Sequence, residues 1–117
     1  MASFVLSLHS APSDTDTLNA LQRFATSALV QGHEIRCIFL YQDGVYHASP
    51  CFDLGSDEFD PAKVWQGLHE QGIALHLCVT AASKRGIDLD RCGVFNVSGL
   101  AEFAMEAAQA DRWVQFK

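Results

Sequence analysis

The sequence predicts an α/β fold: an open, mainly parallel sheet with helices on both faces, formed by a single domain over residues 1–117. Three observations lead to this fold class. Short apolar runs rich in β-branched and aromatic residues alternate with longer segments in which apolar residues recur every three or four positions. The connections are long enough for right-handed crossovers between parallel strands. A chain of 117 residues, 49% of them hydrophobic, can bury one core.

The N-terminal part of the chain predicts a strand followed by a helix. The run SFVLSL at 3–8 is short and apolar, as buried strands are. From 14 to 31, leucines and alanines recur at helical spacing. Ser13 or Asp14 is available as the N-cap of this helix, and Gly32 is placed to end it.

The middle of the chain predicts a second strand, a loop and a second helix. EIRCIFLY at 34–41 has the composition of a strand, and Asp43-Gly44 just beyond it favours a turn. Residues 47–57 show no periodicity and indicate a loop. Asp60 as N-cap and a proline at the next position predict a helix that continues to Gly72.

The remaining elements complete the alternation of strands and helices. Residues 73–79 predict a third buried strand, and 80–85 a short helix that directly follows it. Residues 87–97 are expected to be irregular. A helix over 98–110 and a final strand over 112–116 end the predicted fold.

Charge and composition exclude several classes of function. The net charge of −6 has the wrong sign for direct binding to a nucleic acid. The apolar runs are too short to span a membrane, and no basic segment precedes the first of them, so a cytoplasmic protein is expected. The four cysteines form no C-x-x-C pair, which favours reduced thiols over a disulfide framework.

Cys78 is the candidate catalytic residue, because it lies where the third strand meets the short helix that follows. Ligands bind beyond the carboxyl ends of the strands in sheets of this kind, and a helix N-terminus favours a thiolate. The alternative is a buried core cysteine, which is common. His76 is expected on the same face of the strand and is a possible assisting base, or else a hydrogen-bonded interior histidine.

The other cysteines and histidines carry weaker signals. Cys37 is expected to be inert in the core, whereas Cys51 and Cys92 fall in predicted loops, either as ordinary thiols or as partners that resolve a disulfide. His9 and His47 follow strands, but no compact spacing of metal ligands is present, so no metal is predicted. The absence of a glycine-rich phosphate loop argues against a nucleotide, and no cofactor is expected.

Four stretches, together with the opening strand, give the chain a resemblance to the sulfurtransferases of the DsrE/TusD type. They cover nearly the whole chain in the family's order and are GHEIRCIFLYQDGVY (32–46), SDEFDPAKVWQGL (56–68), GIALHLCVTAASKRGI (72–87) and VSGLAEFAMEAAQADRWVQF (97–116). The resemblance implies a DsrE-like fold. It also implies that Cys78, which matches the family's sulfur acceptor, carries sulfur as a persulfide.

The resemblance further implies a cytoplasmic sulfur relay with protein partners. In one branch of the family the relay feeds 2-thiolation of the tRNA wobble uridine, and in another it serves sulfur oxidation. The implied partners are paralogous subunits of a hetero-oligomer (TusB/TusC-like) or further copies in a homo-oligomer, an upstream sulfur donor (TusA-like), and a small sulfur-accepting protein with a C-terminal cysteine (TusE/DsrC-like). A non-catalytic assembly subunit is the alternative.

Two further features concern assembly and the shape of the site. Four large aromatic residues lie on predicted helices and the terminal strand or just before them, which favours an oligomer unless all of them belong to the core: Phe59, Trp65, Trp113 and Phe116. The segment 87–97 is shorter than in the family members it resembles. A wall of the pocket or part of a subunit interface is therefore expected to differ.

Overall fold

Five parallel strands form one sheet in the order β4-β3-β2-β1-β5. The computed structural model describes residues 1–49 and 60–117. The strands are β1 (Ser3–Leu8), β2 (Glu34–Leu40), β3 (Leu75–Cys78), β4 (Asn96–Ser98) and β5 (Arg112–Phe116). The predicted fold class is confirmed, and every pairing between neighbouring strands is parallel.

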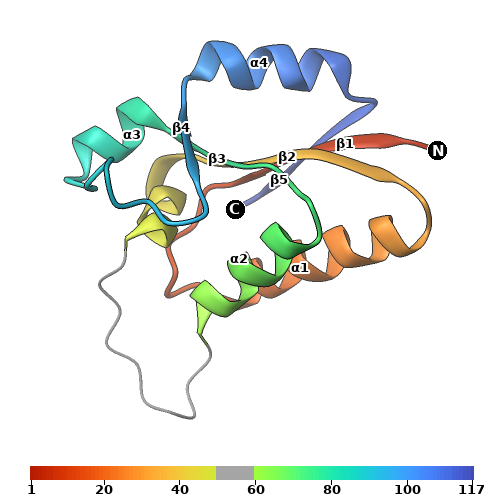
Figure 1. Ribbon diagram of the computed structural model, residues 1–117, viewed down its shortest axis with the longest axis horizontal. Helices are drawn as coiled ribbons and strands as arrows, with labels where there is room; N and C mark the ends of the chain where they lie inside the picture. The colour runs from red at the N-terminus through yellow and green to blue at the C-terminus, as the bar shows by residue number, and fades with distance from the viewer. Residues whose placement is uncertain (50–59) are drawn as a thin grey trace.

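Helices cover the two faces of the sheet unequally. The helices α1 (Thr15–Val30) and α2 (Pro61–Glu70) lie on one face, and α4 (Leu100–Gln109) lies on the other (Figure 1). Two short elements directly follow strands, the 3-10 helix η1 (Gln42–Ala48) after β2 and α3 (Val79–Lys84) after β3. Among the described residues, no helix is long and apolar enough to cross a membrane.

The helix boundaries follow from the caps that the sequence provides. Asp14 is the N-cap of α1, and its carboxylate accepts a hydrogen bond from the backbone N–H of Thr17 at 3.1 Å. Asp60 caps α2 in the same way through the N–H of Ala62, with Pro61 at the first helical position. Gly32 adopts a φ of 85° just beyond α1, where a residue with a side chain would be strained. These predicted starts and stops are confirmed.

The segment 87–97, predicted to be irregular, contains a strand. Residues 96–98 form β4, which pairs with the end of β3 and lies at the edge of the sheet. Two of its three residues are exposed, so the segment lacks the apolar run that indicates a buried strand. The helix predicted from Ser98 begins at Leu100, because residue 98 still belongs to this strand.

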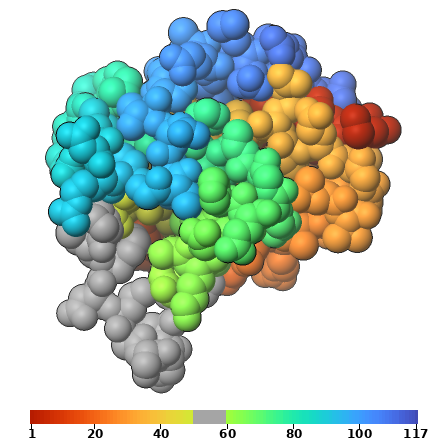
Figure 2. All heavy atoms as spheres, viewed as in Figure 1, coloured from red at the N-terminus to blue at the C-terminus, as the bar shows by residue number. Residues whose placement is uncertain are grey.

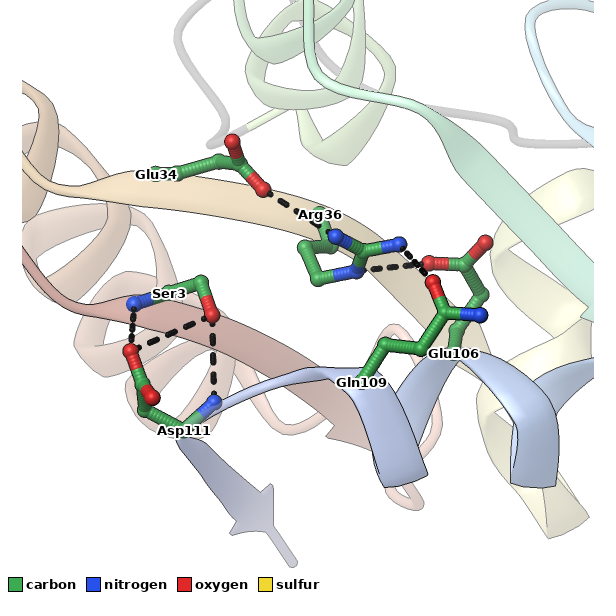
Figure 3. A network of polar contacts seen from close by, with 6 residues as sticks. All are labelled: Ser3, Glu34, Arg36, Glu106, Gln109 and Asp111. Atoms are coloured by element: carbon green, nitrogen blue, oxygen red, sulfur yellow. Dashed lines mark hydrogen bonds and ion pairs between the residues drawn. The ribbon is translucent and has the colours of Figure 1, made fainter.

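The strand β1 lies between β2 and β5 and joins distant parts of the chain. At its start, the backbone N–H of Ser3 donates to Asp111 Oδ2 at 2.8 Å (Figure 3). At its end, the N–H of His9 donates to the carbonyl of Phe116 at 2.9 Å. The two bonds fix both ends of the pairing between β1 and β5.

The aromatic residues expected at an interface divide between core and surface. Trp65 is buried in the core, whereas the side chain of Trp113 is 48% exposed on β5. Phe116 is half-buried, and Phe59 lies outside the described residues. The space-filling view shows α4 along one border of the molecule, with α1 and α2 toward the opposite side (Figure 2). Of the three that the structure describes, Trp113 is therefore the one exposed enough to meet a partner.

Candidate active site

Cys78 is the last residue of β3 and the N-cap residue of α3, the strand-to-helix junction that the sequence predicts. Its neighbour on one side is Ser98 of β4. On the other side, Leu77 of β3 pairs with Leu40 of β2. Tyr41, the residue after Leu40, is therefore level with Cys78. The thiol therefore lies at the carboxyl edge of the sheet, where η1 and α3 begin.

The Cys78 side chain is covered in this structure. It is 1% exposed, and its Sγ makes no capping hydrogen bond to α3. The helix has only six residues, so the field at its N-terminus is weaker than that of a long helix. A reagent or partner can reach the thiol only after the surrounding segments move.

His76 shares a face of the sheet with Cys78, since side chains alternate along a strand. It lines a cavity of about 260 Å³ between the sheet and α4, together with Cys37 and Glu102. Its Nδ1 is buried and has no hydrogen-bond partner among the described residues. The expected alternative of a hydrogen-bonded interior histidine therefore does not account for this nitrogen.

The remaining described cysteines are poor nucleophiles. Burial raises the pKa of Cys37 to about 11, and nearby Glu106 acts in the same direction. Cys92, predicted to be an ordinary loop thiol, is only 6% exposed and donates to the carbonyl of Asp88 at 3.3 Å. Burial and the Asp88 carboxylate raise its pKa as well, so the expectation of an ordinary thiol was wrong. Cys51 lies outside the described residues.

His9 belongs to a chain of polar contacts that links three segments at the carboxyl edge. Its Nε2 is 3.0 Å from Ser7 Oγ, which accepts from Trp113 Nε1 at 2.9 Å. Its Nδ1 is 3.1 Å from the side-chain oxygen of Gln42. Burial lowers the pKa of His9, partly opposed by the bond to Gln42. Gln42 has a φ of 53°, an uncommon conformation for this residue type that the contact with His9 helps to hold.

His47 belongs to the core. Trp65 Nε1 donates to its Nδ1 at 3.2 Å, so the neutral ring carries its proton on Nε2. Burial lowers the pKa of His47 to about 4, and the backbone of Ser10 opposes part of this shift. His9 and His47 therefore have separate protein partners, and neither is brought to Cys78 by a contact of its own.

An ion pair that the sequence analysis missed joins η1 to α3. Arg85 Nε lies 2.9 Å from Asp43 Oδ1, and Arg85 Nη1 donates to the carbonyl of Ala81 at 3.2 Å. The two charged residues are 42 positions apart, so no local spacing reveals the pair. The Asp43-Gly44 turn and the cation before Gly86 were its only signals in the sequence.

A broad apolar groove lies on the sheet face that α4 leaves partly open. Its volume is about 590 Å³, and its aromatic lining comes from Phe39, Tyr41, Phe103 and Trp113. Phe103 stacks on Phe39 with ring centroids 4.5 Å apart and meets Trp113 edge-on at 5.3 Å. His9 also lines the groove, so the groove reaches the carboxyl edge of the sheet.

Comparisons with known proteins agree on one family. Residues 2–116 match the model of the DsrE/DsrF-like family. A curated protein from Klebsiella pneumoniae named sulfurtransferase TusD is 38% identical over 97% of this chain and 98% of its own length. A TusD from Enterobacter sp. is 38% identical over 87% of this chain and 90% of its own.

Two solved structures share the fold. The crystal structure of the ychN protein from E. coli covers 99% of this chain and 100% of its own, with a TM-score of 0.85 and 24% identity. A protein of unknown function from Methanobacterium thermoautotrophicum has a TM-score of 0.75 at 15% identity, covering 98% of this chain and 99% of its own. At these identities the likeness supports the architecture alone.

Proposed function

Since the chain belongs to the DsrE/DsrF-like family, we propose that Cys78 accepts sulfane sulfur as a persulfide and passes it to the thiol of a partner protein. The activity class does not depend on this proposal. With 38% identity to TusD over 97% of the chain, the protein is a sulfurtransferase with a role in sulfur relay. The proposal adds the residue that carries the sulfur and the form in which it is carried.

The position of Cys78 is the observation that supports its role. Of the described cysteines, it is the one at the carboxyl end of a strand, in the layer where α/β sheets bind their ligands. Cys37 lies within β2 with a pKa raised to about 11, and Cys92 is buried in a hydrogen bond to a carbonyl. The other two described thiols are therefore unsuited to nucleophilic attack at neutral pH.

The proposed transfer requires no net oxidant. The Cys78 thiolate attacks the outer sulfur of a donor persulfide, a new S–S bond forms, and the donor thiolate leaves with the electrons of the broken bond. A second exchange of the same kind moves the sulfur to the acceptor thiolate and restores Cys78. His76, on the same face and with a free ring nitrogen, takes the proton from the Cys78 thiol.

The proposed destination of the sulfur is 2-thiolation of the tRNA wobble uridine, with sulfur oxidation as the other branch. The net charge of −6 suits a subunit that passes sulfur between proteins and does not itself hold RNA. The second candidate function is that of a non-catalytic assembly subunit in a DsrE-like hetero-oligomer whose other subunits carry the sulfur. The coverage of Cys78, only 1% exposed, favours that candidate unless the surrounding segments open.

Partners and location form part of the same proposal. We place the protein in the cytoplasm, because the described cysteines are free thiols, as is usual in a reducing compartment. The proposed partners are paralogous subunits (TusB/TusC-like) or further copies of this chain, an upstream donor (TusA-like), and an acceptor with a C-terminal cysteine (TusE/DsrC-like). The open groove beside Trp113 offers an apolar surface for such a subunit.

Replacing Cys78 by serine is expected to abolish sulfur loading. The purified protein would be incubated with a persulfide donor, digested and mapped by mass spectrometry for the added sulfur atom. The wild-type protein should carry it on the peptide that contains Cys78, and the Cys78→Ser variant should carry none there or elsewhere. Cys92→Ser is the matched control and should load normally. Sulfur on another cysteine would reject Cys78 as the carrier, and no sulfur on the wild type would support the assembly subunit instead.

If the protein assembles through the groove, replacing Trp113 by a charged residue is expected to lower the molar mass of the assembly. The wild type, alone or mixed with its paralogous subunits, is expected to form an oligomer, as measured by light scattering at micromolar concentration. Trp113→Glu should disrupt this oligomer, because a buried unpaired carboxylate opposes association. Val30→Glu is the control, since Val30 is 81% exposed on α1, away from the groove. A wild type that is monomeric in both settings would rule out the assembly.

A further inference from the structure

We propose that Arg85 controls access to Cys78 by clamping α3 to η1 through Asp43. The inference rests on the proposed function for its purpose, because a thiol that exchanges sulfur must be covered at rest and reachable by a partner. Whether or not Cys78 carries sulfur, breaking the ion pair between Arg85 and Asp43 should expose Cys78.

Arg85 joins two elements with a single side chain. Its Nε contacts Asp43 Oδ1 of η1 at 2.9 Å, while its Nη1 donates to the Ala81 carbonyl of α3 at 3.2 Å. The planar guanidinium, with several donors in a fixed fork, can serve both acceptors at once. Loss of this side chain therefore removes a tie between the elements and a cap on α3 together.

The helix α3 depends on such ties because it is short. It has six residues, too few for an isolated helix to be stable in water. Ala81 is among the last four residues of α3, whose carbonyls lack partners within the helix and attract cations. By bonding this carbonyl, Arg85 holds the last turn of α3 in the orientation seen here.

The other end of the clamp is firmly fixed. The N–H of Tyr41, just before η1, donates to the Leu8 carbonyl at 3.0 Å, and the N–H of Gly44 donates to the Tyr41 carbonyl at 2.9 Å. Gly44 is packed so closely on β1 that a Cβ there would lie 2.2 Å from the Leu8 oxygen. Asp43 is therefore held on a rigid support, so α3 is the element that moves in this proposal.

Cys78 adjoins the starts of both clamped elements. It is the residue directly before α3, and it is level with Tyr41, the residue directly before η1. Its side chain is 1% exposed. Movement of α3 away from η1 opens the carboxyl edge of the sheet at this position and uncovers Sγ.

The clamp is suited to opening because both of its charges meet solvent. The side chains of Arg85 and Asp43 are 26% and 60% exposed, and ion pairs in such settings are weak and screened by salt. A partner that offers its own carboxylate to Arg85 can replace Asp43 at little cost. Docking of an acidic segment would thereby uncover the thiol.

The test compares the alkylation of two buried cysteines in the same protein. Arg85→Gln and, as a second variant, Asp43→Ala would be treated with iodoacetamide at pH 8, and the labelling of Cys78 and Cys92 followed by peptide mass. We expect Cys78 to label about fivefold faster than in the wild type, the ratio that corresponds to loss of about 1 kcal/mol. Cys92, which is also buried, should keep its rate and reports any general loosening of the fold.

A matched control is available in the first half of β2, away from the carboxyl edge of the sheet. Arg36 has the same side-chain exposure of 26% and an ion pair of the same length, 2.9 Å, but it joins β2 to Glu106 of α4 (Figure 3). Arg36→Gln should leave both labelling rates unchanged. An unchanged ratio of Cys78 to Cys92 labelling in both clamp variants would overturn the proposal, as would equal acceleration of the two cysteines or the same gain in Arg36→Gln.

The same data separate this proposal from the proposed function. Alkylation measures access to Cys78 whether or not sulfur is ever loaded there. Faster labelling of Cys78 in the clamp variants, without any persulfide on the wild type, would support the clamp and reject Cys78 as a sulfur carrier. Persulfide on Cys78, with unchanged Cys78 labelling in both clamp variants, would support the sulfur carrier and reject the clamp.

Discussion

A Gly44→Ala variant is expected to lose about 3 kcal/mol of unfolding free energy, because no room exists for a methyl group at this position. A Cβ on residue 44 would lie 2.2 Å from the carbonyl oxygen of Leu8 and 3.0 Å from its carbon. Both atoms belong to the backbone of β1 or its end, so they cannot turn aside as a side chain would. Either η1 or the end of β1 must shift, and overpacking of this kind costs from about one to several kcal/mol.

Urea denaturation followed by circular dichroism measures this loss, and the chain supplies its own control. Gly67 lies inside α2, and no heavy atom comes within 4 Å of a Cβ built there. Gly67→Ala should therefore leave stability unchanged or raise it by up to about 1 kcal/mol, since alanine favours a helix more than glycine does. Equal losses in the two variants would contradict the close approach of η1 to β1.

Acid is expected to destabilise the protein through His47, by about 3 kcal/mol between pH 6.5 and pH 4. Burial lowers the pKa of His47 from 6.5 to about 4. Between these two pH values the unfolded chain therefore binds a proton at His47 that the native protein does not bind. Stability is therefore complete above pH 6.5 and falls as the pH is lowered, until the native ring itself is protonated near pH 4. Protonation of Nδ1 also breaks the bond that Trp65 donates.

The variant His47→Gln isolates this contribution. Glutamine can accept from Trp65 through its side-chain oxygen but does not titrate. Urea denaturation at several pH values should show a shallower loss between pH 6.5 and pH 4 in the variant than in the wild type. A smaller loss should remain, because the pKa of His9 is lowered in the same direction. Parallel curves for the two proteins would mean that His47 does not govern the acid response.

The sequence predicts the order of elements well where the signal is local. The apolar runs of β1, β2 and β3, the Asp14 cap and the Asp60-Pro61 start each depend on neighbouring residues, and the structure confirms them. The strand β4 was not predicted, because it is a strand through its pairing with β3 and its own composition does not indicate one. Edge strands with exposed side chains carry little hydrophobic pattern.

The contacts of the candidate site are harder to predict because they join distant residues. The strand-to-helix position of Cys78 followed from local patterns, and its proposed role from resemblance to a family. Its coverage and the tie between Asp43 and Arg85 depend on how η1 and α3 pack. Likewise, composition cannot show that Trp65 is buried and Trp113 exposed, or that Cys92 turns inward to bond a carbonyl.

The place of β1 between β2 and β5 has a consequence for synthesis on the ribosome. Of the five strands, β1 emerges first and pairs with β2 soon afterwards, but its other edge stays unpaired until β5 emerges. The contact of Ser3 beside β5 is made by Asp111, 108 positions later and just before that strand. Until residue 116 has emerged, the nascent chain presents an open strand edge to its neighbours on the polysome. The sheet can therefore be completed only after β5 has emerged, and termination before β5 leaves a product in which β1 is an open, aggregation-prone edge strand.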